Sequence, residues 1–253
     1  MSKSSLALVV PCYNEADRLP RDDFLQGMLD HPDWMWILVD DGSKDDTTLL
    51  LEHLRDQVTN CHVFKLSENV GKAEAVRQGV LWALSQPNLS WVGYLDADLA
   101  TPISELARLY DKASQFGKWF VFGSRMNRLG AGIQRSTSRH YLGRVAATAI
   151  SLLLGLPTYD TQCGAKILEA QLARQVFQDP FHSRWLFDVE LLARCRNLLG
   201  VEKLQALVLE EPLLEWVEKG GSKIRPTDLL RLPFELWKIH SQYNGFSNSV
   251  TCY

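Results

Sequence analysis

Residues 91–98 read Trp-Val-Gly-Tyr-Leu-Asp-Ala-Asp, an apolar run that ends in two carboxylates. The run Trp91–Leu95 has the length and composition of a buried strand. In an extended segment, residues two apart project to the same side, so Asp96 and Asp98 leave the strand together. Two carboxylates so placed repel each other unless a cation lies between them, and their hard oxygens suit Mg²⁺ or Mn²⁺. The pattern indicates a divalent-metal site, and the alternative is helix capping by Asp98.

The same order, an apolar strand and then polar residues, recurs through the first half of the chain. Further strands are expected at Leu6–Val10, Trp36–Val39, His62–Leu66 and Trp119–Phe122. Helical spacing lies between them, at Asp22–Leu29, Asp46–Arg55, Lys72–Ser85 and Ser104–Phe116. Strands that alternate with helices predict an α/β fold with a mostly parallel central sheet and helices on both faces.

Polar or charged residues follow each of the five expected strands. They are Pro11–Glu15, Asp40–Ser43, Asn69–Lys72, Asp96–Asp98 and Gly123–Arg125. Ligands of parallel sheets bind at the carboxyl ends of strands, so five polar clusters at one edge predict a binding site rather than five plain turns. In Asn69–Lys72, backbone N–H groups and Lys72 can meet a phosphate. Neither a GxxxxGK nor a GxGxxG pattern is present, which disfavours a P-loop or a dinucleotide site.

The second half of the chain is less regular. Helices are expected at Arg139–Leu154, Phe187–Leu199 and Pro226–His240, with strands at Lys203–Leu209 and from about Asp160 onward. Pro233 should kink or divide the last helix. Residues 1–225 form one α/β domain in this interpretation, and 226–253 form an amphipathic helix and tail. No apolar stretch reaches the ~20 residues of a membrane-spanning helix, so no transmembrane segment is expected.

Composition excludes several classes of protein. The 253 residues carry a net charge of −3, which argues against a nucleic-acid partner. The five cysteines form no CxxC pair, so neither a zinc knuckle nor a disulfide framework is expected, and a cytoplasmic setting is the simplest interpretation. No acidic residue lies between Asp111 and Asp160, whereas that block is rich in basic residues. Arg125 and Arg139 are therefore candidates for binding an anion, since guanidinium matches phosphate geometry; a solvated surface is the alternative.

The ordered motifs Val10-Pro11-x-Tyr13-Asn14-Glu15, Val39–Ser43, Asn69-x-Gly71-Lys72 and Asp96-Ala97-Asp98 resemble inverting glycosyltransferase family two, which has the GT-A fold. Two later runs, Asp160–Gly164 and Arg184–Leu192, resemble the branch of dolichyl-phosphate β-glucosyltransferases and dolichyl-phosphate mannose synthases. Glu215-Trp216 and the following Gly221-Ser222-Lys223 fit the same branch. The resemblance extends from Leu6 to about Ile224.

The resemblance implies a role for individual residues. It assigns the nucleoside to Pro11, Tyr13, Glu15, Val39 and Asp41. It completes the nucleotide-sugar site with Lys72, Asp96, Ala97 and Lys223, of which Lys223 would reach the donor diphosphate. It assigns the metal to Asp96 and Asp98. Arg125 and Arg139 match the positions that hold the acceptor phosphate, and Asp160 matches a position proposed as the catalytic aspartate.

The expected reaction is metal-dependent, inverting transfer of a hexose to a polyprenyl or dolichyl phosphate. UDP-glucose is the favoured donor, with GDP-mannose as the other option. The metal would neutralise charge on the leaving diphosphate, and the basic residues would position the acceptor. Peripheral contact with the cytoplasmic face of a membrane is expected through Val145–Tyr159 and the helix after Pro226. The alternatives are transfer to a soluble acceptor and a non-catalytic nucleotide-sugar-binding protein.

Overall fold

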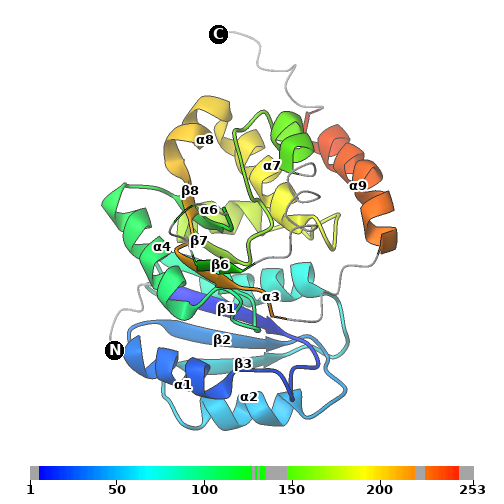
Figure 1. Ribbon diagram of the computed structural model, residues 1–253. Coiled ribbons are helices and arrows are strands. Elements are labelled where there is room, and N and C mark those ends of the chain that lie inside the picture. Colours follow the sequence, from blue (N-terminus) through cyan, green and yellow to red (C-terminus); the bar gives the residue numbers. More distant parts are fainter. Residues whose placement is uncertain (1–5, 127–128, 130–131, 135–146, 220–225, 245–253) are drawn as a thin grey trace.

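Seven strands form one central sheet in the computed structural model, which describes residues 6–126, 129, 132–134, 147–219 and 226–244. These strands are β1 (Leu6–Cys12), β2 (Met35–Asp40), β3 (Cys61–Lys65), β4 (Trp91–Leu95), β5 (Phe120–Ser124), β7 (Ala165–Glu169) and β8 (Val208–Pro212). Their order across the sheet is β3-β2-β1-β4-β7-β5-β8 (Figure 1). Two short strands, β6 (Gly132–Gln134) and β9 (Glu215–Val217), pair separately.

Helices cover both faces of this sheet. They are α1 (Arg21–Asp30), α2 (Thr47–Arg55), α3 (Lys72–Leu84), α4 (Ile103–Gln115), α6 (Ala170–Val176), α7 (Phe187–Leu199), α8 (Val201–Leu207) and α9 (Pro226–Asn244), and residues 147–154 are also helical. Side chains of a strand alternate between its faces. In β1, Leu6 and Leu8 join the core with α1, α2 and α4, whereas Ala7 and Val9 join the core with α3, α6 and α7. The expected α/β fold is thereby confirmed.

One strand of the sheet runs against the others. β7 lies between β4 and β5 and is antiparallel to both, whereas β3, β2, β1 and β4 are parallel to one another, as β5 is to β8. The start of β7 therefore lies at the carboxyl ends of β4 and β5. As a result, residues 160–164 reach the edge where the polar clusters of the first half also lie.

The structure corrects two expectations for the second half. Lys203–Leu209 was expected to be a strand, but residues up to Leu207 belong to α8 and the strand β8 begins at Val208. Leu204 and Leu207 are three apart, so this short apolar run fits a helix as well as a strand. Pro233 was expected to kink or divide the last helix, and it does not divide it, because α9 continues across it. Burial of Leu236 and Ile239 in the core favours the continuous helix.

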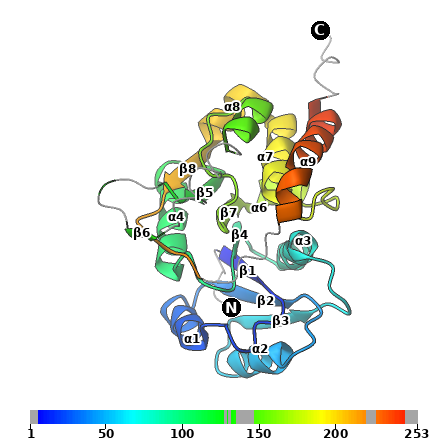
Figure 2. The ribbon, with the colours of Figure 1, turned by 45° about the vertical axis from the view of Figure 1, so that its right-hand side comes forward.

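The C-terminal helix packs on the body of the protein. α9 lies beside α7 in both views (Figures 1 and 2), and its Leu236 and Ile239 are buried. On another face of α9, Phe234 and Trp237 are 62% and 63% exposed. Within the part of the chain that the structure describes, no helix is both long and apolar enough to cross a membrane.

Candidate functional site

An ion pair lies at the carboxyl ends of the parallel strands. Lys72, the first residue of α3, places its Nζ 2.5 Å from Oδ1 of Asp96, which directly follows β4. Both side chains are more than one third exposed. Partial burial disfavours the charged ammonium, but the carboxylates of Asp96, Asp188 and Asp98 outweigh this effect and raise the pKa of Lys72. The edge therefore brings Lys72 and Asp96, both predicted site residues, into direct contact.

Gly164, just before β7, leaves room for the carboxylate of Asp96. A Cβ atom on Gly164 would lie 2.1 Å from Oδ2 of Asp96, which only a glycine avoids. The backbone N–H of Asp96 also donates to the carbonyl of Gly164, with N and O 3.2 Å apart. The glycine of the motif Asp160–Gly164 thus has a physical explanation: it gives Asp96 room at the edge of the sheet.

The residues after β4 fit a divalent cation by their chemistry. Asp98 uses Oδ1 to accept the backbone N–H of Ala100 at 2.9 Å, and Asp96 uses Oδ1 for Lys72. Among the described residues, no group of three His, Cys, Asp or Glu side chains is arranged to hold a metal. A cation held by Asp96 and Asp98 would complete its shell with water and donor phosphates, as Mg²⁺ commonly does.

Asp41, the first residue after β2, fixes the loop that leads into α3. Its two carboxylate oxygens accept N–H groups from Val70 at 2.8 Å, from Gly71 at 3.0 Å and from the Asn69 side chain at 3.0 Å. Burial raises the pKa of Asp41, and the hydrogen bonds from Val70 and Gly71 oppose that shift. In this structure the carboxylate of Asp41 therefore shapes the loop that carries Lys72.

Neighbouring loops interlock in a similar way. Asp40 accepts the backbone N–H of Ser43 at 2.9 Å and the hydroxyl of Thr48. The backbone N–H of Glu15 donates to Thr47 at 2.7 Å, and the Glu15 carboxylate pairs with Arg18 at 2.7 Å. The loops after β1 and β2 are thus joined by short polar side chains, which places Glu15 and Asp41 at the same edge.

The other predicted nucleotide residues occupy that edge in different ways. Pro11 and Tyr13 are half-buried in or just after β1. Ala97 is 5% exposed, between the two carboxylates. The side chain of Val39 is fully buried and packs toward Gly79 of α3, so any contact of Val39 with a nucleoside would use its main chain.

A second, more buried ion pair lies beyond β5. Arg125 donates to Asp160 through Nε at 2.6 Å, Nη2 at 2.7 Å and its backbone N–H at 3.0 Å. Burial disfavours the guanidinium charge, but Asp160 outweighs it and raises the pKa of Arg125. Asp160 is 8% exposed, and Glu210 of β8 accepts its backbone N–H at 2.7 Å. The structure thus brings two predicted catalytic residues into direct contact.

Sequence reasoning assigned no role to three buried residues beneath the edge. Asp188, at the start of α7, pairs with Lys166 at 2.7 Å and accepts the hydroxyl of Tyr94 at 2.5 Å. Lys166 of β7 is fully buried and donates to the carbonyl of Cys163. A signal existed, because Asp188 lies inside the motif Arg184–Leu192, but no spacing rule joins it to Lys166.

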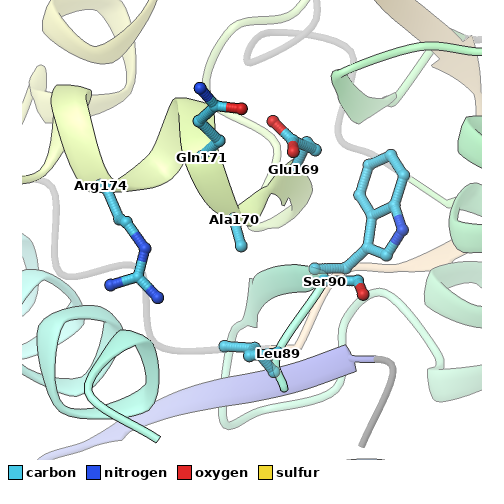
Figure 3. Close-up of a pocket in the computed structure, with 7 residues that line it drawn as sticks. Leu89, Ser90, Glu169, Ala170, Gln171 and Arg174 are labelled. Carbon is cyan, nitrogen blue, oxygen red and sulfur yellow. The ribbon is translucent and has the colours of Figure 1, made fainter. Parts of the chain in front are cut away.

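Two of the predicted residues, Arg139 and Lys223, lie outside the described part of the chain. None of the predicted site residues that the structure describes lines a surface pocket of about 460 Å³ (Figure 3). Leu89, Ser90 and Trp91 line it from the amino end of β4, and Glu169, Gln171 and Arg174 from the start of α6. Because the polar clusters lie at the opposite end of β4, this pocket is not part of the candidate site.

Solved structures of two glycosyltransferases resemble this fold. Glucosyl-3-phosphoglycerate synthase of Mycobacterium tuberculosis, in complex with Mn²⁺, UDP and glucosyl-3-phosphoglycerate, superposes with a TM-score of 0.66 at 18% identity, over 97% of this chain and 82% of that one. Mannosyl-3-phosphoglycerate synthase of Rubrobacter xylanophilus gives 0.68 at 16% identity, over 94% and 73%. The fold is that of the GT-A glycosyltransferases.

The family follows from the sequence match. This chain belongs to glycosyl transferase family 2, whose model matches residues 7–177, and it is a glycosyltransferase. The dolichyl-phosphate β-glucosyltransferase of Drosophila melanogaster is 33% identical over 258 residues, which cover 94% of this chain and 75% of the relative. That of Dictyostelium discoideum is 30% identical over 263 residues, which cover 93% and 77%.

Proposed function

We propose that this protein transfers glucose from UDP-glucose to a dolichyl or related polyprenyl phosphate, with Mg²⁺ or Mn²⁺ held by Asp96 and Asp98. The observation that supports donor binding is the carboxylate edge, where Gly164 leaves room for Asp96 and Asp96 pairs with Lys72. The names of the relatives, dolichyl-phosphate β-glucosyltransferases at 30–33% identity, support the sugar and the acceptor. The Mn²⁺ and UDP bound to the Mycobacterium tuberculosis enzyme support the metal and the nucleotide.

The donor would bind where the loops after β1, β2 and β4 meet. Asp41 shapes the loop before α3, so that Lys72 stands next to Asp96 at the mouth of the site. A divalent metal, when bound, would neutralise the charge that develops on the leaving diphosphate. Lys72 would add a second positive charge on the same side, because its raised pKa keeps it protonated at neutral pH.

The acceptor would bind on the side of Arg125. Asp160 occupies Nε and Nη2 of this guanidinium, which fixes its plane and leaves Nη1 for an acceptor phosphate. We therefore assign Asp160 as an orienting group rather than a base. An acceptor phosphate is already anionic, so attack on the anomeric carbon needs position more than proton removal. One displacement would invert the configuration at that carbon.

A cavity beside the second ion pair suits the lipid part of the acceptor. Its volume is about 420 Å³, and it lies between the end of β5 and the helix 147–154. Met126, Leu152 and Pro157 contribute apolar walls, and Glu210, which anchors Asp160, lines its floor. We assign the first part of the polyprenyl chain to this cavity, next to the phosphate held by Arg125.

The test is a panel of nucleotide sugars scored by turnover. UDP-glucose and GDP-mannose would be offered with undecaprenyl phosphate, dolichyl phosphate or 3-phosphoglycerate, with Mn²⁺ and with excess EDTA. We expect turnover with UDP-glucose and a polyprenyl phosphate in the presence of metal. Turnover on 3-phosphoglycerate alone would replace the lipid acceptor with a soluble one. Donor binding without turnover on any acceptor would indicate a binding protein.

We also propose peripheral contact with a membrane, which would bring the enzyme to a lipid acceptor. Phe234 and Trp237 of α9 are exposed, and their ring centroids are 6.2 Å apart. Exposed aromatic side chains are favoured at the membrane interface. We expect co-sedimentation with anionic vesicles at low salt, and its loss in the Phe234→Ser, Trp237→Ser double variant. Leu49→Ser on α2 is the matched control, because Leu49 is 65% exposed at the far side of the sheet.

A further inference from the structure

We propose that Arg184 binds the diphosphate of the donor, as a second cation beside Lys72. The inference rests on the proposed function in one respect, namely that the donor is a nucleoside diphosphate sugar. Arg184 lies in the segment between α6 and α7, far along the chain from the polar clusters of the first half. Its side chain is exposed, and the motif Arg184–Leu192, in which it stands first, predicts no role for it.

The side chain of Arg184 lies over the loop that begins α3. Its Cδ and Nε atoms lie 3.7 and 3.9 Å from the position of a Cβ built on Gly71, the residue before Lys72. The positive charge of Arg184 also acts on Asp41, where it opposes the rise in pKa that burial causes. Arg184 therefore lies beside Gly71, the residue before Lys72, and close enough to Asp41 to act on its charge, although it comes from a different part of the fold.

A buried carboxylate fixes the segment that carries Arg184. Glu190 of α7 is fully buried and accepts the backbone N–H groups of His182 at 2.9 Å and Ser183 at 3.2 Å. The Ser183 hydroxyl in turn accepts the N–H of Leu186 at 2.9 Å. The backbone on both sides of Arg184 is thus anchored, so little backbone freedom would be lost when the side chain meets a ligand.

A second set of contacts strengthens this anchor. Arg194 donates to the carbonyl groups of Val176 at 2.9 Å, Asp179 at 2.7 Å and Pro180 at 2.6 Å, and it pairs with Glu190 at 2.8 Å. Tyr243 of α9 donates to the same Glu190 carboxylate at 2.8 Å. These bonds join α7, α9 and the segment before Arg184 into one unit, which Figure 2 shows beside α3.

The negative charges at the donor edge outnumber the positive charge of Lys72, so a second cation would favour binding of a diphosphate. Asp41, Asp96 and Asp98 are acidic, and Lys72 is already 2.5 Å from Asp96. A nucleoside diphosphate adds further negative charge to this edge. A guanidinium offers several N–H donors in one plane and matches phosphate oxygens, which suits Arg184 better than a lysine for this contact.

The test separates phosphate binding from nucleoside binding. UDP and uridine would be titrated in the presence of Mn²⁺ into the wild type, Arg184→Gln and Arg184→Lys. We expect Arg184→Gln to weaken UDP about 10- to 100-fold, as loss of a charge-assisted hydrogen bond does, and to leave uridine within about twofold. Arg184→Lys should recover part of the loss. Arg174→Gln is the matched control, because this exposed arginine lies at the opposite end of the sheet (Figure 3).

The possible results distinguish failure of the proposed function from failure of the Arg184 assignment. A wild type that binds no nucleotide overturns the proposed function, and this inference with it. A wild type that binds UDP, together with an Arg184→Gln variant that binds it equally well, overturns the inference alone. An equal loss of UDP and uridine would mean that Arg184 acts on the nucleoside or on the loop at Gly71, which overturns the assignment to the diphosphate.

Discussion

The two sides of the site edge are held together by different means. On the donor side, short carboxylates accept backbone N–H groups, as Asp41 does from Val70 and Gly71. On the side of β5, the buried pair of Arg125 and Asp160 joins two distant segments. A lost hydrogen bond to a charged group costs about 1.5–3 kcal/mol, whereas a buried charge left without its partner costs about 3–5 kcal/mol. We therefore expect changes on the donor side to alter binding, and changes on the β5 side to alter folding as well.

The largest effect should come from Asp160→Ala. The variant leaves the buried guanidinium of Arg125 without its partner and removes the acceptor for its backbone N–H. We expect the free energy of unfolding, measured in urea, to fall by about 3–5 kcal/mol. The double variant Arg125→Met, Asp160→Leu should recover much of that loss, since no buried charge remains. Equal stability of Asp160→Ala and the wild type would remove the contrast between the two sides.

Asp98→Asn should leave stability unchanged but reduce metal affinity and turnover. The asparagine keeps an oxygen for the N–H of Ala100, so we expect the unfolding transition to stay where it is. Changing residues that merely orient a metal ligand lowers metal affinity or activity about 10- to 100-fold, and loss of a ligand should cost at least as much. Calorimetric titration with Mn²⁺ and steady-state turnover would measure this. Full wild-type turnover in excess EDTA would rule out the metal site.

Asp41→Asn should affect both properties moderately, with weaker donor binding and some loss of stability. Val70 and Gly71 donate to different oxygens of Asp41, and an asparagine has only one oxygen, so its NH₂ group would face one of these N–H donors and the loop before Lys72 must shift. We expect UDP to bind about tenfold more weakly, which corresponds to about 1.4 kcal/mol, with a modest loss of stability. Asp23→Asn, an exposed change in α1, controls for the altered charge. Unchanged affinity for UDP would separate this loop from the donor site.

The smallest expected effect is a pH dependence of stability that comes from Glu190, the carboxylate that anchors the segment carrying Arg184. Burial opposes ionisation of Glu190, but hydrogen bonds from His182 and Tyr243 and the charge of Arg194 outweigh it and lower the pKa of Glu190 below 4.5. A lowered folded-state pKa stabilises the protein above pH 4.5, and that contribution disappears as the pH falls through the folded-state pKa. Urea unfolding at several pH values should therefore show the difference between wild type and Glu190→Gln narrowing in acid. A difference independent of pH would contradict this.

Much of the first half could be predicted from the sequence, because each strand is a buried apolar run that ends in polar residues. β4 begins and ends at the predicted residues, and α2 and α3 differ from their predicted bounds by one. The second half was harder for physical reasons. The short run after Gly200 fits two periodicities, and the direction of β7 depends on its neighbours in the sheet, which no local pattern contains.

The site residues divide in the same way. Motifs predicted site roles for Asp41, Lys72 and Asp96. In the structure, Lys72 forms an ion pair with Asp96. The bond between Arg125 and Asp160 could not be predicted, because it depends on the reversed strand that delivers Asp160 to the edge. Glu210 was missed altogether, since a carboxylate in β8 whose task is to accept two backbone N–H groups belongs to no motif.

The reversed strand β7 also bears on how the chain folds. It pairs with β4 on one side and with β5 on the other, so the sheet stays in two pieces until residues 165–169 are inserted. Contacts between residues far apart in sequence form slowly, because closing a long loop costs entropy before any contact compensates for it. The pairing of Leu6 in β1 with Trp91 in β4 also closes a long loop, so loop length alone does not order these steps. Because β7 alone joins the two pieces, we expect the sheet to close only when β7 enters. A nascent chain that ends before residue 160 would already carry Asp96 and Asp98 but neither Asp160 nor Gly164, which lie just before β7. Activity should therefore not appear before β7 closes the sheet.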